Sequence, residues 1–209
     1  TPRDENTPDL KTYHPTTFMN PGYEILFFWV ARMILMSGFL LGEVPFKTVY
    51  LHGILRDAQG RKFSKSLETG MDPVDVINQY GTDALRMSVI VGIAPGNDGN
   101  FSLDKVKAYK HFANKLWNIA RFVLMSIPEN YSDSDTSLAA EDEKILADMR
   151  NFVKGITEHM DNYRLYLAAD EIYHYVWHTF ADKVIEESKS KLASEDQTVK
   201  ASAERMLLE

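Results

Sequence analysis

Two lysines and two serines occur within five residues, from Lys62 to Ser66, directly after a predicted strand and turn. Lysine ammonium groups placed in this way can bind a polyphosphate and neutralise the charge that builds on a leaving pyrophosphate. In open α/β sheets, ligands bind at the loops that follow the carboxyl ends of strands. A solvated basic turn has the same composition, so these five residues alone leave a phosphate site and a plain surface turn as alternatives.

Basic and aromatic residues also alternate along a predicted helix over residues 102–127, a pattern that can present a nucleic-acid surface. At helical spacing most of these aromatic side chains are expected in the core, with one or two free to stack. A histidine pair, His174 and His178, has the four-residue spacing of a zinc site, but no third ligand is evident and no metal site is expected. The residues of the basic and aromatic pattern are Lys105, Lys107, Lys110, Lys115, Arg121, Tyr109, Phe112, Trp117 and Phe122.

The elements before the lysine loop form an α/β segment. Residues 1–19 contain three prolines and no helical period, which predicts irregular or briefly extended chain. The stretch from Tyr23 to about Leu41 is apolar on all sides and predicts a core helix that ends at Gly42. Its apolar run is about a dozen residues and is interrupted by Arg32, whereas a membrane span needs about 20. Apolar and β-branched residues over 48–55 then predict a buried strand.

Helices dominate after the loop. Asp72 and Pro73 predict the start of a short helix that Gly81 ends, and a second helix is expected from Asp83 to about Val91. After a cluster of turn residues, apolar spacing predicts amphipathic helices over 102–127, 141–163 and 165–192, and a further helix from residue 194. We therefore expect an α/β domain over residues 1–100, followed over 101–209 by an all-α domain of antiparallel helices.

The composition is that of a folded globular chain. Of 209 residues, 44% are hydrophobic and 25% are charged, which excludes disordered, collagen-like and low-complexity proteins. The net charge of −7 is uneven, because residues 1–128 hold 14 Lys and Arg against 12 Asp and Glu, whereas residues 129–209 hold 9 against 18. The first part is the better candidate for meeting phosphate. With no cysteine and no visible signal peptide, a reducing, cytoplasmic compartment is expected.

The lysine loop and its flanks together resemble the class I aminoacyl-tRNA synthetases. Residues 62–66 are similar to the KMSKS signature of that family, with Phe63 in place of methionine. Within the family, the pattern resembles the valyl-tRNA synthetases, because isoleucyl and leucyl relatives have a different segment at residues 22–33. The resemblance fades only after about Lys183. The flanking segments that carry it are Gly22–Met33, Pro45–Gly53, Arg56–Arg61, Asp72–Ile77, Tyr80–Arg86 and Ala94–Asp98.

The resemblance implies roles for the residues of the loop. Lys62 and Lys65 would hold the phosphates of ATP and act in catalysis. Lys65 is the better candidate for acting on charge that grows in the transition state. Ser64 and Ser66 would position the loop and belong to the same ATP site.

Residues outside the loop receive implied roles as well. Glu24 would contact the ribose hydroxyls or the ammonium group of the amino acid, and His52 with Gly53 would contact adenine. Ile25 and Trp29 would line the pocket for the valine side chain, although core packing explains two apolar residues at this spacing equally well. For the helical part, the residues implied in tRNA binding are Lys105, Lys107, Phe112 and Phe122.

The implied enzyme joins valine to ATP, forming valyl-adenylate and pyrophosphate, and passes valine to tRNA(Val). Its partners are tRNA(Val), valine and ATP with Mg²⁺, without a membrane, and it is expected to be a monomer. In that family the first half of the Rossmann fold, with a HIGH signature, and an editing domain precede this region, and no His-x-Gly-His occurs in the 209 residues. We therefore expect an internal, inactive fragment that holds the second half of the Rossmann fold and part of an anticodon-binding helical bundle.

Two alternatives remain at this level. One is an isoleucyl-type synthetase, which the size of the pocket at Trp29 would distinguish. The other is a helical tRNA-binding or adaptor module with a vestigial nucleotide site. Phe63, Glu24 and the pair Glu68–Thr69 depart from the family pattern and leave this second alternative open.

Overall fold

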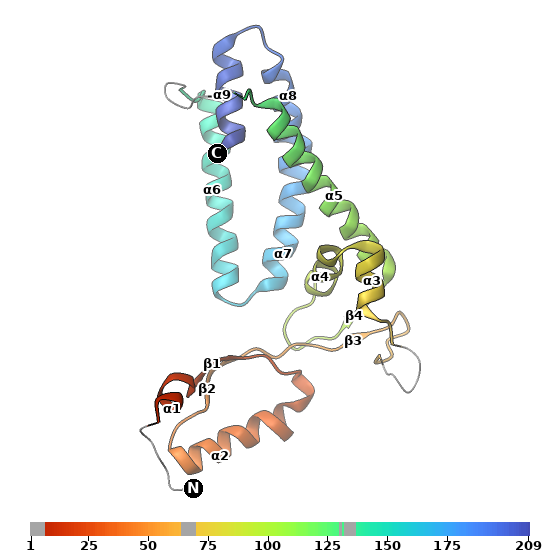
Figure 1. Ribbon diagram of the computed structural model, residues 1–209, viewed down its shortest axis with the longest axis vertical. Helices are drawn as coiled ribbons and strands as arrows, with labels where there is room; N and C mark the ends of the chain where they lie inside the picture. The colour runs from red at the N-terminus through yellow and green to blue at the C-terminus, as the bar shows by residue number, and fades with distance from the viewer. Residues whose placement is uncertain (1–6, 64–69, 130, 132–136) are drawn as a thin grey trace. The chain divides into compact units, whose positions relative to one another are not determined.

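The computed structural model describes residues 7–63, 70–129, 131 and 137–209 (Figure 1). The chain divides into two compact units, each described here by itself. Unit 1 comprises Thr1–Gly70 and Ile93–Phe101, and unit 2 comprises Met71–Gly92 and Ser102–Glu209. The expected domain boundary near residue 100 therefore differs from the division into compact units, because two helices within 71–92 pack with the helices that follow.

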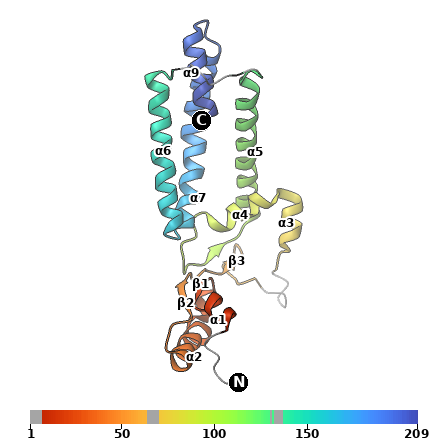
Figure 2. The same cartoon turned by 60° about the vertical axis from the view of Figure 1, so that its left-hand side comes forward.

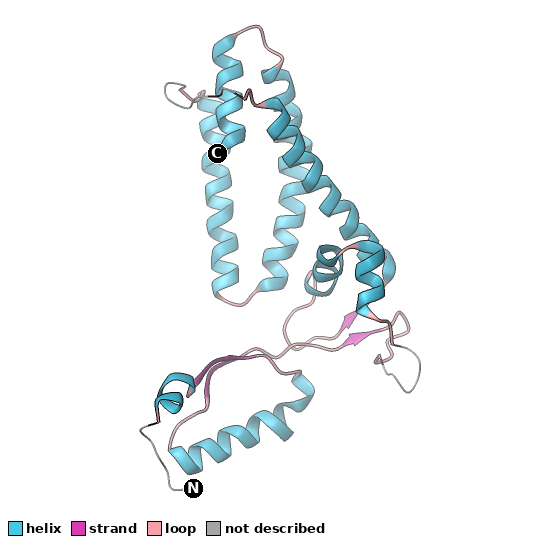
Figure 3. Cartoon of the chain, viewed as in Figure 1, coloured by secondary structure: helices cyan, strands magenta, loops and turns pink. Residues whose placement is uncertain are grey.

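Unit 1 is built on a strand–helix–strand crossover. Strands β1 (Thr16–Met19) and β2 (Phe46–Val49) pair in parallel, with Thr16 opposite Phe46 and Met19 opposite Val49. The connection between them is helical over residues 23–41, as η1 (Tyr23–Ile25), η2 (Leu26–Val30) and α2 (Ala31–Leu41), with a short loop at each end (Figure 3). Parallel strands cannot be joined by a tight turn, so a helix of this length is the usual connection.

The first residues are more regular than the sequence predicts. A short helix, α1 (Pro8–Tyr13), precedes β1, with Pro8 at the first helical position. Proline is tolerated there because the first amides of a helix have no partner within it. The prediction of irregular chain is therefore wrong for residues 8–13, which form α1. The prediction of briefly extended chain is confirmed for residues 16–19, which form β1.

The helix from Tyr23 to Leu41 is not the buried core helix that its composition predicts. Val30 is its only buried residue, whereas Phe27, Phe28 and Phe39 are 80–84% exposed. A sheet of two strands is too narrow to cover more than one face of a helix, so its apolar side chains remain open within unit 1. By length and composition alone, the 19-residue helix over Tyr23–Leu41 is long and apolar enough to cross a membrane. It ends at Gly42, as predicted, in the left-handed conformation.

The extended chain over residues 46–56 is the central segment of unit 1. Residues 46–52 pair with residues 16–22, and the last pair is Gly22 opposite His52. β3 (Leu55–Arg56) then pairs in parallel with β4 (Gly99–Asn100). The predicted strand over 48–55 is thus two short strands, and of its residues none is fully buried. The central segment changes its hydrogen-bonding partner at residues 52–54.

Unit 2 begins with helices whose ends follow the predicted caps. α3 (Pro73–Tyr80) starts after Asp72, whose carboxylate accepts a hydrogen bond from the Val74 amide at 2.8 Å, and it ends at Gly81. α4 (Thr82–Ile90) packs along α5 (Leu103–Ser126). Ser102 caps α5, since its hydroxyl accepts from the Lys105 amide at 3.2 Å. These local signals were sufficient to place the helices.

The remaining helices form the larger part of unit 2. α6 (Ala140–Asp161) lies beside a continuous helix made of α7 (Leu165–His174), η3 (Tyr175–Ile185) and α8 (Glu186–Leu192), and α9 (Gln197–Leu208) returns along α6 and α8 (Figure 2). Asp142, 1% exposed, joins three of them, because its carboxylate accepts from Lys191 of α8 and Ser202 of α9, each at 2.5 Å. The buried apolar residues of unit 2 include two clusters, one of Ile119, Ala181 and Ile185 and one of Leu146, Val184 and Met206.

Candidate functional site

Lys62, at the start of the lysine loop, lies against Glu24, at the start of the long helix. The Lys62 Nζ atom is 3.0 Å from Glu24 Oε1 and 3.2 Å from Oε2. Both side chains are about half exposed, at 55% and 46%. An exposed ion pair of this kind stabilises a protein by at most about 1 kcal/mol, so a stronger anion can draw Lys62 away. The structure thus brings together two site residues that the sequence separates by 38 positions.

Backbone pairing explains why these side chains meet. The Tyr23 amide, one residue before Glu24, donates to the His52 carbonyl at 3.0 Å. After the turn at residues 57–61, Lys62 forms an antiparallel bridge with Arg56, so Lys62 lies beside the end of the central segment. Glu24, His52 and Lys62 therefore lie around the part of the central segment that follows β2. This is the carboxyl end of a parallel strand, where ligands bind in open α/β sheets.

The turn before Lys62 is held by one carboxylate. Asp57 accepts hydrogen bonds from the amides of Gln59 and Arg61, at 2.9 and 2.8 Å, and from the Arg61 guanidinium at 2.8 Å. Burial alone would raise the pKa of Asp57, but the hydrogen bonds from Arg61 and Gln59 outweigh it and hold that pKa below its ordinary value. The backbone entering the lysine loop is therefore fixed by local contacts.

Gly53 is required by packing inside unit 1. A Cβ atom built at this position would lie 1.6 Å from the carbonyl oxygen of Asn97, a distance that no side chain can occupy. The glycine therefore allows the central segment to approach the turn at residues 94–98. Contact of His52 and Gly53 with adenine stays a prediction.

A residue that the sequence analysis assigned no role, Asp98, joins the segments around this site. Its carboxylate accepts from the Ile54 amide at 2.9 Å, from the Arg56 guanidinium, and from the Tyr23 hydroxyl at 3.4 Å. Hydrogen bonds from Ile54 and Arg56 are the main reasons that the pKa of Asp98 lies below its ordinary value. From the sequence, Asp98 could be assigned only to a turn cluster, because the residues that it bonds are more than 40 positions away.

Ile25 and Trp29 lie on the exposed part of the helix. Their exposed fractions are 38% and 48%, and the guanidinium carbon of Arg32 lies 4.7 Å from the centre of the Trp29 ring. Within unit 1 neither residue is buried. Their role in an amino-acid pocket stays a prediction. Ser64, Lys65 and Ser66 lie outside the described residues.

The residues predicted to bind RNA divide into two groups. Phe112 is 3% exposed and its ring centre is 4.9 Å from that of Tyr173, so it is a core residue and cannot stack on a base. Lys105 also points inward, because its ammonium group donates to the Val91 carbonyl at 2.9 Å and burial lowers its pKa. Both predictions are corrected on this ground. Lys107 is exposed, as the prediction requires.

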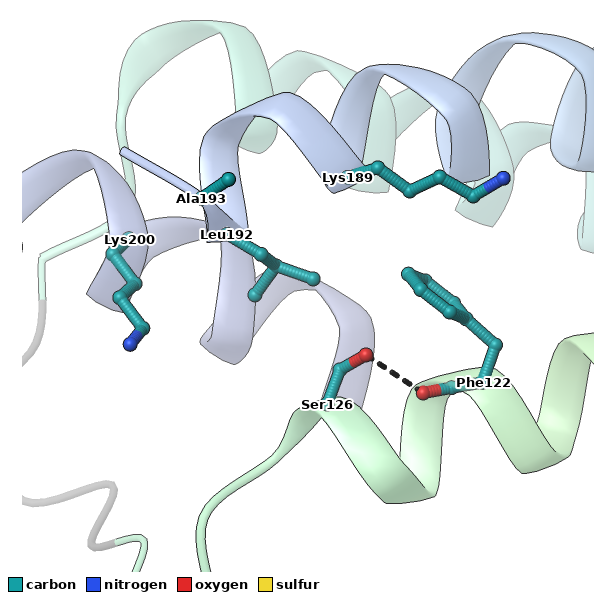
Figure 4. A pocket seen from close by; sticks show the side chains of 6 residues that line it. All are labelled: Phe122, Ser126, Lys189, Leu192, Ala193 and Lys200. Atoms are coloured by element: carbon teal, nitrogen blue, oxygen red, sulfur yellow. Dashed lines mark hydrogen bonds between the residues drawn. The ribbon is translucent and has the colours of Figure 1, made fainter. Parts of the chain in front are cut away.

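Phe122 is only partly buried and lines a cavity of about 290 Å³ between α5, α8 and α9 (Figure 4). The ammonium group of Lys189 lies 5.8 Å from the centre of the Phe122 ring. Lys200 lines the same cavity from α9, and neither of these lysines was singled out in the sequence. The other lining residues are Ser126, Leu192 and Ala193. Lys189 also pairs with Glu186 at 2.6 Å, and the Phe122 ring packs in part against the buried cluster of Ile119, Ala181 and Ile185. A lysine beside a partly exposed ring, with a second lysine on the same cavity, can contact an RNA backbone and base.

The part of the chain that the structure describes contains no cluster of three His, Asp or Glu side chains arranged to hold a metal ion. His174 and His178 stack with ring centres 5.6 Å apart, and His174 lies 3.7 Å from Asp170 on the same helix. A stacked pair with a carboxylate neighbour accounts for these histidines.

Comparison with known families matches both ends of the chain. Residues 2–102 match the family described as tRNA synthetases class I (I, L, M and V). Residues 142–209 match the family described as the anticodon-binding domain of tRNA ligase. The first match contains the Glu24–Lys62 pair, and the second contains α8 and α9.

Curated relatives agree along almost the whole chain. Valine--tRNA ligase of Clostridium acetobutylicum is 43% identical over 202 residues, which cover 95% of this chain and 23% of that protein. Valine--tRNA ligase of Lactobacillus acidophilus is 44% identical over 209 residues, which cover 98% of this chain and 24% of that protein. The chain therefore spans about a quarter of the length of the curated relatives that it matches.

Solved structures share the fold at lower identity. Methionyl-tRNA synthetase of Mycobacterium tuberculosis, bound by methionyl-adenylate, has a TM-score of 0.76 at 23% identity, covering 98% of this chain and 41% of that chain. The agnB2 LeuRS of Agrobacterium radiobacter K84, in a ternary complex with tRNA and LeuAMS, has a TM-score of 0.62 at 19% identity, covering 93% and 25%. At these identities the likeness concerns the fold.

Proposed function

This chain belongs to the class I aminoacyl-tRNA synthetases, and we propose that it supplies the lysine-loop half of the site at which a longer enzyme activates valine with ATP and charges tRNA(Val). The observation that carries the proposal is the contact between Lys62 and Glu24 beside His52. A cation for phosphate and a carboxylate for ribose or an ammonium group then lie at one edge of the parallel strands. The strand–helix–strand crossover is assigned to the second half of a Rossmann fold.

In the proposed reaction the carboxylate of valine attacks the α-phosphate of ATP. A new bond forms between that oxygen and phosphorus, the bond to the bridging oxygen breaks, and pyrophosphate leaves with the electron pair. Lys62 leaves Glu24 to hold a phosphate, and Lys65 is proposed to stabilise the charge that grows on the leaving group. The nucleophile is already ionised at neutral pH, so the site needs positioning and positive charge and no general base.

Mg²⁺ is proposed to enter with the phosphates of ATP as part of the substrate. Carboxylates are its usual protein ligands, and the described residues place no group of three suitable side chains together. Glu24, the carboxylate at this edge, is paired with Lys62. This chain's contribution to neutralising the phosphates is therefore its lysines.

The apolar helix from Tyr23 to Leu41 is proposed to pack against protein in the longer enzyme. Arg32 lies in its middle, and a charged side chain at the centre of a membrane span costs about 2.5–3.5 kcal/mol or more. Glu24 at its start is paired with Lys62, which is part of the polar site. This arrangement fits a helix covered by protein better than a membrane span.

The helices from α5 onward are proposed to be part of an antiparallel anticodon-binding bundle. Lys107, Phe122, Lys189 and Lys200 are the candidates for contact with tRNA. This part of the chain is acidic overall, with 18 Asp and Glu against 9 Lys and Arg over 129–209. RNA contact is therefore expected to be confined to the local basic surface around the Phe122 cavity, and to weaken steeply with salt.

Exchange of labelled pyrophosphate into ATP tests the proposal. The ligase that contains this segment is incubated with ATP, Mg²⁺ and a single amino acid, and valine is expected to support exchange with a higher kcat/KM than isoleucine. A preference for isoleucine would favour the isoleucyl alternative, to which the valine--tRNA ligase relatives give no support. Binding of tRNA without exchange for any amino acid would favour an adaptor module.

A further inference from the structure

We propose that Asp98 is a positioning residue that holds the Glu24–Lys62 pair at the ATP site. This inference rests on the proposed function, because the pair matters only if it meets substrate. The carboxylate of Asp98 is partly buried, with a side-chain exposure of 20%. It has no place in the proposed chemistry itself, since its oxygens are occupied by protein donors.

Each donor to Asp98 belongs to a different part of the site. Tyr23 precedes Glu24, so its hydroxyl bond attaches the start of the helix. Arg56 pairs across the backbone with Lys62, so its guanidinium bond attaches the chain that enters the lysine loop. Ile54 follows His52 and Gly53, so its amide bond attaches the central segment. One carboxylate therefore connects the three segments that carry the site residues.

The Arg56 side chain extends this connection into the turn before Lys62. Its Nη1 atom donates to the Gly60 carbonyl at 3.2 Å while its Nε atom donates to Asp98. The pKa of Arg56 is raised, chiefly by its hydrogen bond to Asp98 and by the charge of that carboxylate. Asp98 directly precedes β4, where the Gly99 amide donates to the Ile54 carbonyl at 3.1 Å. The acidic group therefore lies at the end of the regular pairing between β3 and β4.

Asparagine is the informative substitution at this position. It keeps the size of the side chain and one oxygen for the Ile54 amide. Its NH₂ group, however, would face the Arg56 guanidinium, and two donors cannot bond to each other. The Asp98→Asn change should therefore release Arg56 and the chain leading to Lys62 while leaving the backbone pairing of β3 with β4.

The test uses the ligase that contains this segment, with activity expressed per active site from a titration of adenylate formed. Asp98→Asn is expected to raise the KM for ATP about 5- to 30-fold, as removal of the Lys62 ammonium group would, because that group is no longer held in place for the phosphates. The kcat and the KM for valine should each stay within threefold. Asp9→Asn, a matched change of an exposed carboxylate in unit 1, should leave the KM for ATP unchanged.

A double variant distinguishes positioning from general damage. If Asp98 acts through Lys62, then the KM for ATP of the variant that combines Asp98→Asn with Lys62→Ala should be no more than about threefold higher than that of the more severe single variant. A KM raised by the product of the two separate effects would overturn the inference, as would a KM for ATP in Asp98→Asn within twofold of that of the unaltered enzyme. Should Asp98→Asn fail to fold, Arg56→Lys is measured in the same cycle, because lysine cannot bond Asp98 and Gly60 as the guanidinium does.

Hydrogen exchange of the 209-residue chain gives a second readout that needs no activity. The Arg61 amide and its neighbours from Asp57 to Lys62 should exchange at least tenfold faster in Asp98→Asn, relative to the α5 amides of the same sample. Unchanged hydrogen exchange of these amides would contradict the inference even if the ligase were active. Absence of valine-dependent exchange in the unaltered ligase would instead contradict the proposed function, and the hydrogen-exchange result would still decide the role of Asp98.

Discussion

Replacing Lys62 by alanine should weaken ATP binding and leave the chemical step nearly unchanged. In the structure the ammonium group is already paired, at 3.0 and 3.2 Å from the Glu24 carboxylate oxygens. A hydrogen bond between charged groups contributes about 1.5–3 kcal/mol to binding. Breaking an exposed ion pair to form it costs about 0.2–1 kcal/mol. With both ranges taken near their middles, the net contribution of Lys62 to ATP binding is about 1–2 kcal/mol, which corresponds to a factor of roughly 5–30.

The assay is valine-dependent exchange at varied ATP concentration in the ligase that contains this segment. Lys62→Ala is expected to raise the KM for ATP about 5- to 30-fold, with kcat within threefold. Lys47→Ala removes another exposed lysine of unit 1 and serves as the matched control, with no change in the KM for ATP. An unaltered KM in Lys62→Ala, or a fall in kcat larger than the rise in KM, would refute the assignment of Lys62 to ground-state binding of phosphate.

Three further predictions concern other parts of the chain. Lys65→Ala should lower kcat for exchange about 10²–10³-fold with little change in the KM for valine, because it removes about 2.7–4 kcal/mol of transition-state stabilisation; a loss of only a few-fold would remove Lys65 from the mechanism. Trp29→Ala should lower the kcat/KM for valine relative to that for isoleucine, by a factor that corresponds to at most the ~1–3 kcal/mol that one methylene contributes to discrimination. An unchanged ratio would show that Trp29 faces no substrate. Asp142→Ala should lower the free energy of unfolding of the 209-residue chain by about 3–5 kcal/mol in urea titrations, since it leaves the Lys191 ammonium without its buried partner. The control is Glu141→Ala, because the Glu141 side chain is 86% exposed, and it should change the free energy of unfolding by less than about 0.5 kcal/mol.

Local signals in the sequence were sufficient for the helix ends. Asp72 and Ser102 each accept a hydrogen bond from a first-turn amide, and Gly42 takes a positive φ, as the residue types predict. Such caps depend on residues a few positions apart, so a linear reading finds them. The exposure of Phe28 and its neighbours could not be found in this way, because burial depends on which elements lie beside a helix and not on its own composition.

The site was accessible to sequence reasoning only through resemblance. No spacing rule connects Glu24 with Lys62, or Asp98 with Arg56, because backbone pairing across 38 and 42 positions brings them together. Phe112 was assigned wrongly for a different reason, because helical spacing alone does not show which aromatic residues of one helix are buried. Its contacts with Tyr173 place it in the core, whereas Phe122, ten residues later, borders a cavity with two lysines.

The most direct test of the account replaces the corresponding segment of Clostridium acetobutylicum valine--tRNA ligase with these 209 residues and measures valyl-adenylate formation. The two segments are 43% identical over 202 residues, so the swapped enzyme is expected to fold and to retain valine-dependent adenylate formation. The 209-residue chain alone should form none above background, because alignment of the reactants, which can account for about 7–11 kcal/mol of the barrier, needs the rest of the site. A folded swapped enzyme without valyl-adenylate, or robust adenylate formation by the 209 residues alone, would contradict the account.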